Sequence, residues 1–340
     1  MNDNFSIISL KKKKLILVLI SGISLTIFFS LTSLFIGAVK LDLINLLFGK
    51  SDVKNLELVM NVRAPRIVTA IIVGASLSVA GAVMQNIFRN PLVDPYITGV
   101  ASGAAFTTSL SVLLGITFLS PASLYALPVM AFIGAIIALI LTLFFARLAG
   151  GTYLSLLLSG IAISFLFSSA TTIVVTTSAG KTYGIIFWLF GSLITSSWKF
   201  IYIMAPISIV VLCYILFNAR RMNVLMLGDD EARQLGVNVS SLRRNFVISL
   251  SLLTSISVAF NGIIGFIGLI APHISRLLVG EDHRILLPST IFTGGIILIL
   301  ADLAARTFIA PAELPIGALT SSIGAPFFLF LLIKMHRRHR

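Results

Sequence analysis

Apolar segments of about 20 residues recur along this chain from Leu15 to Ile333, and each is long enough to cross a bilayer as a helix. The 340 residues are 57% hydrophobic and only 11% charged, whereas soluble domains carry about 25% charged residues. No stretch between the apolar segments could form a soluble core of its own. The sequence therefore predicts an all-α polytopic membrane protein with one transmembrane domain over residues 1–340.

The number of crossings follows from the basic ends of the chain. Residues 1–14, which include Lys11 to Lys14, and the tail 335–340 are both basic, so the positive-inside rule places both in the cytoplasm and requires an even number of crossings. The run from Phe246 to Val279 could be one long span or two short spans broken near Asn261-Gly262, Gly265 and Gly268. Two spans there give about ten in all. The expected spans are residues 15–38, 62–86, 95–115, 122–147, 152–178, 198–218, 244–266, 268–279, 285–304 and 315–334.

The remaining composition excludes several other classes. The net charge of +13 comes from residues that flank apolar spans, such as Arg220-Arg221 and Arg243-Arg244, so we expect no nucleic-acid partner. The apolar run Leu15 to Ile36 is too long for a signal-peptide core, so it reads as an uncleaved first span. The single cysteine, Cys213, lies in an apolar run and supports no disulfide framework.

Two weaker patterns concern the shape of the bundle. The apolar segment Tyr183 to Leu193 is too short to span and predicts an interfacial or re-entrant helix on the outer side. The similarity between Ser76 to Gly81 and Ser255 to Ala259, in spans of opposite direction, suggests an inverted repeat, with chance similarity as the alternative. Small residues predict close helix contacts, which serve packing equally well with or without transport: Gly74, Gly81, Gly103 and Gly294-Gly295.

The spans contain few groups that could perform chemistry. Asp302 and Arg306 are spaced i,i+4, which favours an ion pair at a helix end. His273 is the only histidine within an expected span that could act as a ligand, and a lone histidine near a helix end is more often structural. Gly180-Lys181-Thr182 resembles the end of a phosphate-binding loop, but Val175 stands where that motif needs glycine. We expect no catalytic residues, no metal site and no nucleotide hydrolysis by this chain.

A polar interruption from Met222 to Val239 is the best clue to function. It reads MNVLMLGDDEARQLGVNV and predicts a small helix in the aqueous phase, which could present a contact to a soluble partner. An acid at Asp229 or Asp230 near its start favours the helix dipole, and Gly236 suits its end. Ala232 and Leu235 are expected to offer a small apolar face. The alternative is a plain solvated loop.

Four motifs carry a resemblance to a known family over roughly residues 60 to 335. They are RAPR (63–66) with the following VGASLSVAGAVMQNIFRNPLVDPYITGVASGAAF, LGDDEARQLGVNV (227–239), GFIGLIAPHISRLLVGEDHRILLP (265–288) and ADLAARTFIAPAELPIGALTSSIGAPFFLFLL (301–332). In this order they resemble the membrane subunits of iron-siderophore, haem and cobalamin ATP-binding-cassette importers, the FecCD-like type II importers. The resemblance implies a ten-helix permease that works as a homodimer, with the transport path at the dimer interface. It also implies two ATPase subunits, which would hold ATP and magnesium, and an extracytoplasmic solute-binding protein.

The resemblance also implies roles for particular residues. Residues 220–241 would be a cytoplasmic coupling segment, inserting into a cleft on the ATPase through Gly228, Asp229, Asp230, Glu231, Ala232, Arg233, Leu235 and Gly236. Arg63, Arg66 and Arg306 would pair with glutamates of the binding protein, a task that suits the planar guanidinium fork. The alternative for each arginine is contact with lipid headgroups.

A cytoplasmic gate and an inner turn complete these expectations. Thr152 and Tyr153 occupy the place where relatives carry small polar gate residues, and the bulky tyrosine departs from that pattern. The segment Asn90 to Pro95 is expected to form a rigid turn because each proline disfavours helix at the residue before it. A structural role for this turn is favoured over contact with the ATPase.

These patterns predict a transport subunit, not an enzyme, in the lipid of the cell (inner) membrane with both termini cytoplasmic. The expected cargo is a metal chelate, with ferric siderophore favoured and cobalamin or haem as alternatives. A secondary transporter driven by an ion gradient and acting alone is a distant alternative, because such proteins usually keep ionisable residues inside their spans.

Overall fold

The computed structural model describes residues 2–37, 53–116, 123–178 and 182–338, and the regular structure in these ranges is helical throughout. The all-α prediction is confirmed. The N-terminal half contains α1 (Asn2–Phe35), α3 (Val53–Leu58), a π-helical turn η1 (Val59–Arg63), α4 (Ala64–Ile87), a 3-10 turn η2 (Pro95–Thr98), α5 (Val100–Leu113), α6 (Ser123–Leu148) and α7 (Tyr153–Thr177). The C-terminal half contains α8 (Thr182–Leu189), α9 (Trp198–Phe217), α10 (Ala219–Leu225), α11 (Asp229–Gln234), α12 (Val239–Asn261), α13 (Ile267–Val279), α14 (His283–Thr307) and α15 (Ile316–Arg338).

Each of the ten expected spans coincides with a helix in the described part of the chain: α1, α4, α5, α6, α7, α9, α12, α13, α14 and α15. Six helical segments there are long and apolar enough to cross a membrane, and they contain α1, α4, α6, α7, α9 and α14. Residues 38 and 122 at two expected span ends, Gly180 and Lys181 of the glycine-lysine pattern, and His339 and Arg340 of the tail lie outside the described residues.

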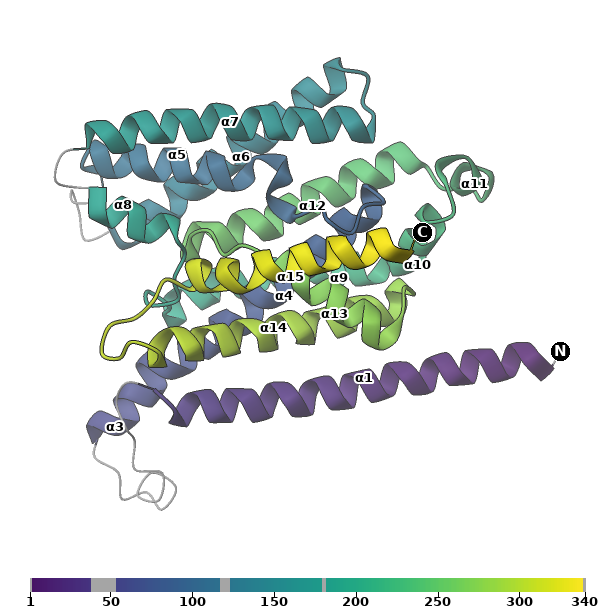
Figure 1. The fold of residues 1–340 in the computed structure, drawn as a ribbon, viewed down its shortest axis with the longest axis horizontal. Helices are drawn as coiled ribbons and strands as arrows, with labels where there is room; N and C mark the ends of the chain where they lie inside the picture. Colours follow the sequence, from purple (N-terminus) through teal and green to yellow (C-terminus); the bar gives the residue numbers. More distant parts are fainter. Residues whose placement is uncertain (1, 38–52, 117–122, 179–181, 339–340) are drawn as a thin grey trace.

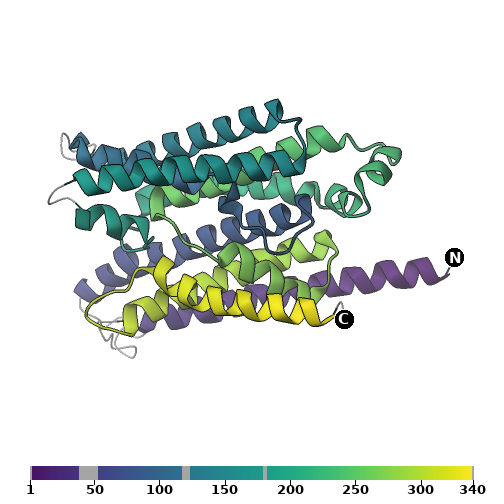
Figure 2. The ribbon, with the colours of Figure 1, turned by 45° about the horizontal axis from the view of Figure 1, so that its top comes forward.

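The run from Phe246 to Val279 forms two helices, as the charge argument required. The break lies at Gly262 and Phe266, whose φ angles of 69° and 66° are left-handed and stop a helix from continuing. The hydroxyl of Tyr96 donates to the carbonyl of Ile264 (2.9 Å) and accepts from its amide (3.2 Å), which satisfies backbone exposed by the break. Both chain ends consequently lie at the same end of the bundle (Figures 1 and 2).

The short helix α8 lies at the end of the bundle opposite the two chain ends (Figure 1). It covers Thr182–Leu189, eight residues, which is too short to span a bilayer. A short helix is therefore present in the segment Tyr183 to Leu193, ending at Leu189, and its interfacial or re-entrant position stays a prediction. The end that holds the chain termini, α10 and α11 is called the termini end below, and the other the α8 end.

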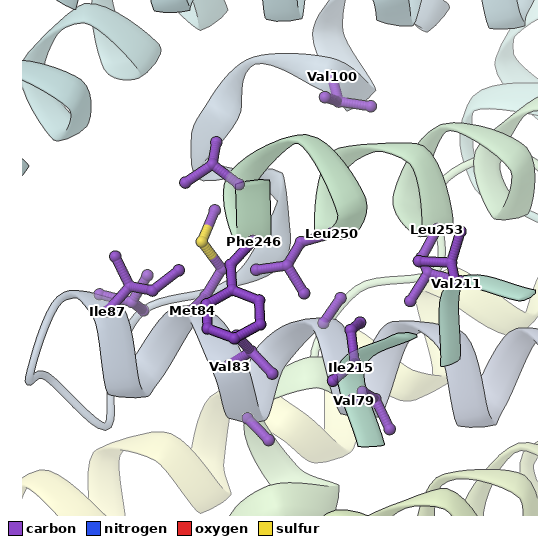
Figure 3. Close-up of a cluster of buried hydrophobic side chains, with 14 of the residues drawn as sticks. Val79, Val83, Met84, Ile87, Val100, Val211, Ile215, Phe246, Leu250 and Leu253 are labelled. Carbon is purple, nitrogen blue, oxygen red and sulfur yellow. The ribbon is translucent and has the colours of Figure 1, made fainter. Parts of the chain in front are cut away.

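Helix α4 runs through the middle of the bundle and packs against α14, α13, α12 and α9. Most of its residues are buried, whereas α1 and α7 stay largely exposed. Figure 3 shows part of the core between α4 and its neighbours, where the ring of Phe246 from α12 lies beside Met84 and Val83 of α4. At 24 residues α4 is about 36 Å long, so it connects the two ends of the molecule.

Glycines set how closely the central helices approach. A Cβ on Gly81 of α4 would overlap the carbonyl of Gly268 in α13, and one on Gly74 would overlap that of Gly294 in α14. The predicted close contacts at these small residues are confirmed. Helices α4 and α12 run in opposite directions, as the possible inverted repeat requires, but the repeat itself stays a prediction (Figure 1).

Candidate functional site

The polar interruption between α9 and α12 folds into two short helices at the termini end of the molecule (Figures 1 and 2). Helix α11 begins after Gly228, whose φ of 141° is open chiefly to glycine, and ends before Gly236, with φ 79°. Its first turn consists of three acids, Asp229 to Glu231, where the helix dipole favours negative charge. The predicted helix and both predicted glycine boundaries are present.

The exposed face of this segment differs from the expected one. Ala232 is fully buried and packs into the main core cluster, so it cannot form an apolar contact surface with Leu235 as predicted. The amide of Val237 also bonds to the carbonyl of Ala232 (3.0 Å), which folds the chain back over it. Leu227, which the sequence reasoning missed, is 63% exposed and Leu235 is 61% exposed. The exposed large apolar side chains of this segment are therefore Met226, Leu227 and Leu235, of which the two leucines are the most exposed.

Helix α11 is fastened to the two central helices through Asp229. Its Oδ1 accepts from Arg89 (2.7 Å), in the turn directly after α4, and from Arg243 (3.1 Å), in the second turn of α12. Arg89 holds a φ of 48°, and its guanidinium also donates to the carbonyl of Leu225 in α10 (3.3 Å). Displacement of α11 would therefore pull on α4 and α12 together.

A second set of hydrogen bonds fastens α10 to α14 and α1. Asp282, directly before α14, accepts from Asn223 of α10 (2.7 Å) and from Lys11 of α1 (3.1 Å). The neighbouring Arg284 guanidinium, together with these hydrogen bonds, holds the pKa of the Asp282 carboxyl well below its usual range. Asp282 is thus a fixed negative charge that joins three helices at the termini end.

His283 extends this network to α4. The amide Oδ1 of Asn223 accepts from the backbone of His283 and lies 2.9 Å from its Nδ1, while Asn86 Nδ2 lies 3.2 Å from its Nε2. Because Asn223 Nδ2 donates to Asp282, its oxygen faces the histidine, which assigns the ring proton to Nδ1. Nε2 then accepts from Asn86. Together with Asp229, this histidine ties the segment α10–α11 to α4 at two separate points.

The predicted gate residues lie across a cleft from α11 and the start of α12. Thr152 caps α7, because its Oγ1 accepts from the amide of Ser155 (3.1 Å), and it follows two glycines of positive φ, Gly150 and Gly151. Thr152 and Tyr153 are both exposed. The cleft has a volume of about 1000 Å³ and is lined on its other side by α11 and the first turns of α12. The gate role of Thr152 and Tyr153 stays a prediction, and the structure shows a capping role for Thr152.

The three arginines expected to dock a binding protein meet at the α8 end but point into the chain. Arg66 donates through Nε to Asp302 (2.6 Å) and through its two terminal nitrogens to Glu313 (3.1 and 2.7 Å), a bidentate arrangement. Arg306 Nε lies 3.0 Å from Asp302 Oδ2, which confirms the predicted i,i+4 ion pair. Arg63 donates to the carbonyl of Leu34 in α1 (2.6 Å).

Burial of the three arginines restricts how they could dock a binding protein. Arg63, Arg66 and Arg306 are each 4–5% exposed. Arg66 and Arg306 compensate the charge of the buried Asp302 carboxylate, and Arg63 bonds to backbone carbonyls at the end of α1. Docking through them stays a prediction, and for Arg66 it requires that Glu313 release the guanidinium.

A comparison with known proteins agrees with the motifs and with the helical fold. The model of the FecCD transport family matches residues 25–334, nearly the whole chain. The chain belongs to the FecCD transport family. It is a multi-pass permease, a transport subunit of an ATP-binding-cassette transporter and not an enzyme.

Relatives of this FecCD permease are similar over most of their length. A protein of Methanocaldococcus jannaschii named as an ABC transporter permease is 41% identical over 96% of this chain and 97% of its own. The hemin transport permease of Yersinia pestis is 39% identical over 82% and 84%, and the cobalamin import permease of Halobacterium salinarum is 42% identical over 81% and 73%. A solved structure described as an inward-facing metal-chelate type ABC transporter has a TM-score of 0.84 and 36% identity, covering 93% of this chain and 99% of that one.

In this FecCD permease side-chain hydrogen bonds hold the expected turn between α4 and α5, and the choice between a structural role and contact with the ATPase stays a prediction. The side chain of Asn90 accepts from the amide of Leu92 (2.9 Å), and that of Asp94 accepts from the amide of Tyr96 (2.9 Å). Burial raises the pKa of the Asp94 carboxyl to about 6.

His273 packs edge-on against the ring of Phe327, 5.8 Å between centroids. Within the described ranges, no three His, Cys, Asp or Glu residues gather closely enough to hold a metal ion.

Proposed function

We propose that this FecCD permease forms the transmembrane part of an ATP-driven importer that carries a metal chelate, with ferric siderophore as the cargo. The observation that carries the proposal is the segment α10–α11. It presents exposed leucines, Leu227 and Leu235, beyond the ends of the spans, yet Asp229 fastens it to the centre of the bundle. Such a segment suits a partner that pushes on the permease from the aqueous side.

The described contacts provide a route for that push. A displacement of α11 acts through Asp229 on Arg89 at one end of α4, and α4 carries Arg66 at its other end. Since α4 is buried along most of its length, it moves with the bundle around it. Two ATPase subunits, which hold ATP and magnesium, would thereby influence the α8 end, where an extracytoplasmic solute-binding protein delivers the cargo.

The permease acts as a homodimer, with the transport path between the two copies. The exposed face of α7 supports this proposal because it combines polar side chains with large apolar ones. The exposed polar residues of α7 are Ser168, Ser169, Thr172, Thr176 and Thr177. A face of this kind suits an interface that also contacts water.

The orientation follows from charge. The basic segment with Lys11 to Lys14 lies at the termini end, beside Asp282 and the coupling segment, so this end faces the cytoplasm by the positive-inside rule. Both chain ends are then cytoplasmic in the cell membrane. The α8 end faces outward, where the delivering protein would bind.

Support for a metal chelate comes from the metal-chelate type transporter that resembles this chain and from its hemin and cobalamin relatives. A bulky chelate also suits the few ionisable groups in the spans, since such a cargo can be released without a tight polar site. Reconstitution with the cognate ATPase and binding protein would rank ferric siderophore against cobalamin, hemin and molybdate, the last named for a relative from Haemophilus influenzae.

The first experiment is co-purification of the ATPase with the wild-type chain and with a Leu227→Asp, Leu235→Asp variant. Both leucines are exposed, so the variant should fold while losing the ATPase by at least tenfold. Phe308→Asp makes the same kind of change at an exposed site of the α8 end and should retain the ATPase. Uptake by wild type that an ion gradient drives without any ATPase would instead support a secondary transporter.

A further inference from the structure

The cleft of about 1000 Å³ at the termini end is lined by four arginines and one acid. The arginines are Arg147 in the last turn of α6, Arg233 in α11, and Arg243 and Arg244 in α12, and the acid is Asp229. Asp229 is already shared between Arg243 and Arg89. The cleft therefore holds an excess of positive charge, which an anion entering it would offset.

Two of these arginines have no ion-pair partner in the described part of the chain. Arg147 and Arg244 are exposed, and neither takes part in an ion pair there. A ligand with several acceptor oxygens, such as a phosphate, could accept from both of these exposed guanidinium groups at once.

The ends of the candidate spans indicate that the cleft lies near the level of lipid headgroups. Helix α6 ends its candidate membrane span at Leu148, and the next candidate span begins at Tyr153, so the turn between them is at the membrane surface. Arg243 and Arg244 lie in the second turn of α12, at a similar level beside this turn. A basic pocket between helix ends on the cytoplasmic side is a setting in which anionic lipids bind.

The apolar part of the lining favours a lipid over a soluble anion. Leu143, Phe144 and Val247 line the cleft beside the arginines. Phe144, at 55% exposure, continues into the exposed apolar surface of α6 formed with Phe145 and Leu148. A ligand with a charged head and a hydrocarbon tail would contact both surfaces at once, whereas an acidic peptide or free phosphate would use only the arginines.

We propose that this cleft binds the phosphate headgroup of an anionic phospholipid, with its acyl chains along Phe144 and Leu148. The headgroup bridges the α6–α7 turn, which holds Thr152 and Tyr153, and the α11–α12 region. The assignment rests on the proposed function only for the side of the membrane that the cleft faces. Binding itself is measurable without an ATPase or a cargo, so its failure is distinguishable from failure of the importer proposal.

The test compares thermal unfolding of the purified full chain with added phosphatidylglycerol or phosphatidylcholine in detergent, and titrates phosphatidylglycerol by native mass spectrometry. Phosphatidylglycerol should raise the unfolding temperature of wild type, and phosphatidylcholine should leave it unchanged. Arg147→Gln with Arg244→Gln should weaken phosphatidylglycerol binding by roughly thirtyfold, since each basic residue near an anionic headgroup contributes about 1 kcal/mol. Arg220→Gln, at an exposed arginine that does not line the cleft, should leave the affinity unchanged.

Three results would overturn the assignment. Equal stabilisation of wild type and the double variant by phosphatidylglycerol would show that the cleft does not hold the lipid. Equal stabilisation by sodium phosphate at matched ionic strength would show a free-anion site. A double variant that keeps its lipid affinity but loses the co-purified ATPase would assign the arginines to an acidic surface of that partner.

Discussion

Arg66 is held by two carboxylates at once, Asp302 through Nε and Glu313 through both terminal nitrogens. Substitution Arg66→Met should lower the free energy of unfolding by about 3–5 kcal/mol, because it leaves Asp302 buried with one counter-charge fewer. Chemical or thermal unfolding in detergent measures this. Arg233→Met, at an exposed arginine of α11, is the control and should cost less than about 1 kcal/mol.

The same variant decides between structural and docking roles. An unchanged unfolding midpoint together with a weaker affinity for the binding protein would mean that Arg66 is free in solution. Loss of stability with unchanged affinity would assign it to the fold.

Because of Asp94, the stability of the folded protein is predicted to depend on pH. Its pKa is raised from 3.8 to about 6 by burial, so the folded state favours the protonated carboxyl. As pH rises from about 4 to 6, the unfolded chain releases this proton first and stability falls. Asp94→Asn keeps the acceptor for the Tyr96 amide, so it should stabilise the fold by about 1–3 kcal/mol at pH 8 and by nothing near pH 4. Unfolding curves at both pH values measure the difference.

The exposed acid Asp230 serves as the matched control for Asp94. Asp230→Asn changes the same group at an exposed position and should give no gain at either pH. A gain for Asp94→Asn that is equal at pH 4 and pH 8 would contradict burial as the cause.

Among the helices, the contact between α4 and α14 contains two adjacent glycines of α14 whose surroundings differ. A Cβ at Gly294 would overlap the carbonyl of Gly74 and the side chain of Ser78, whereas one at Gly295 would make an ordinary contact 3.5 Å from Ile71. Gly294→Ala should therefore separate the helices and destabilise the protein by about 1–3 kcal/mol, the usual cost of overpacking. Gly295→Ala should stay within about 0.5 kcal/mol of wild type. Equal unfolding midpoints for the two variants would contradict the close contact.

Local patterns predicted most of the elements. The apolar spans and the glycine ends of α11 follow from residues within one or two turns of each other, whereas the break near Gly262 was predicted from the basic charge at the two chain ends. The ion pairs between distant residues could not be predicted from local patterns, because Asp229 meets Arg89 across 140 positions and Arg66 meets Glu313 across 247. The inward burial of Ala232 depends on how α11 folds back against the core, which no local spacing encodes. Leu227 could have been found as a large apolar residue directly before a glycine in a polar segment.

At the scale of the whole molecule, the exposed helices present two kinds of surface. Beyond Lys11 to Lys14, the exposed large residues of α1 are apolar, as in Ile23 and Leu31, which suits lipid. Helix α7 instead exposes Thr172 and its polar neighbours. The hydroxyl of Thr172 bonds to the carbonyl of Ser168 (3.0 Å), so this face is compatible with lipid as well as with water, and its surroundings must be measured.

The homodimer proposal predicts that water reaches the exposed face of α7. In a Cys213→Ser background, Thr172→Cys should react with a membrane-impermeant maleimide at least tenfold faster than Ile23→Cys on α1, because only a hydrated thiol forms thiolate readily. Thr171→Cys, the adjacent and buried position, should be as slow as the α1 control. If Thr172→Cys and Ile23→Cys label equally slowly in membranes, α7 faces lipid and the path between two copies must be sought on another helix. If labelling is fast and slows when ATP and the ATPase are added, the path along α7 closes in response to the partner that α11 is proposed to contact.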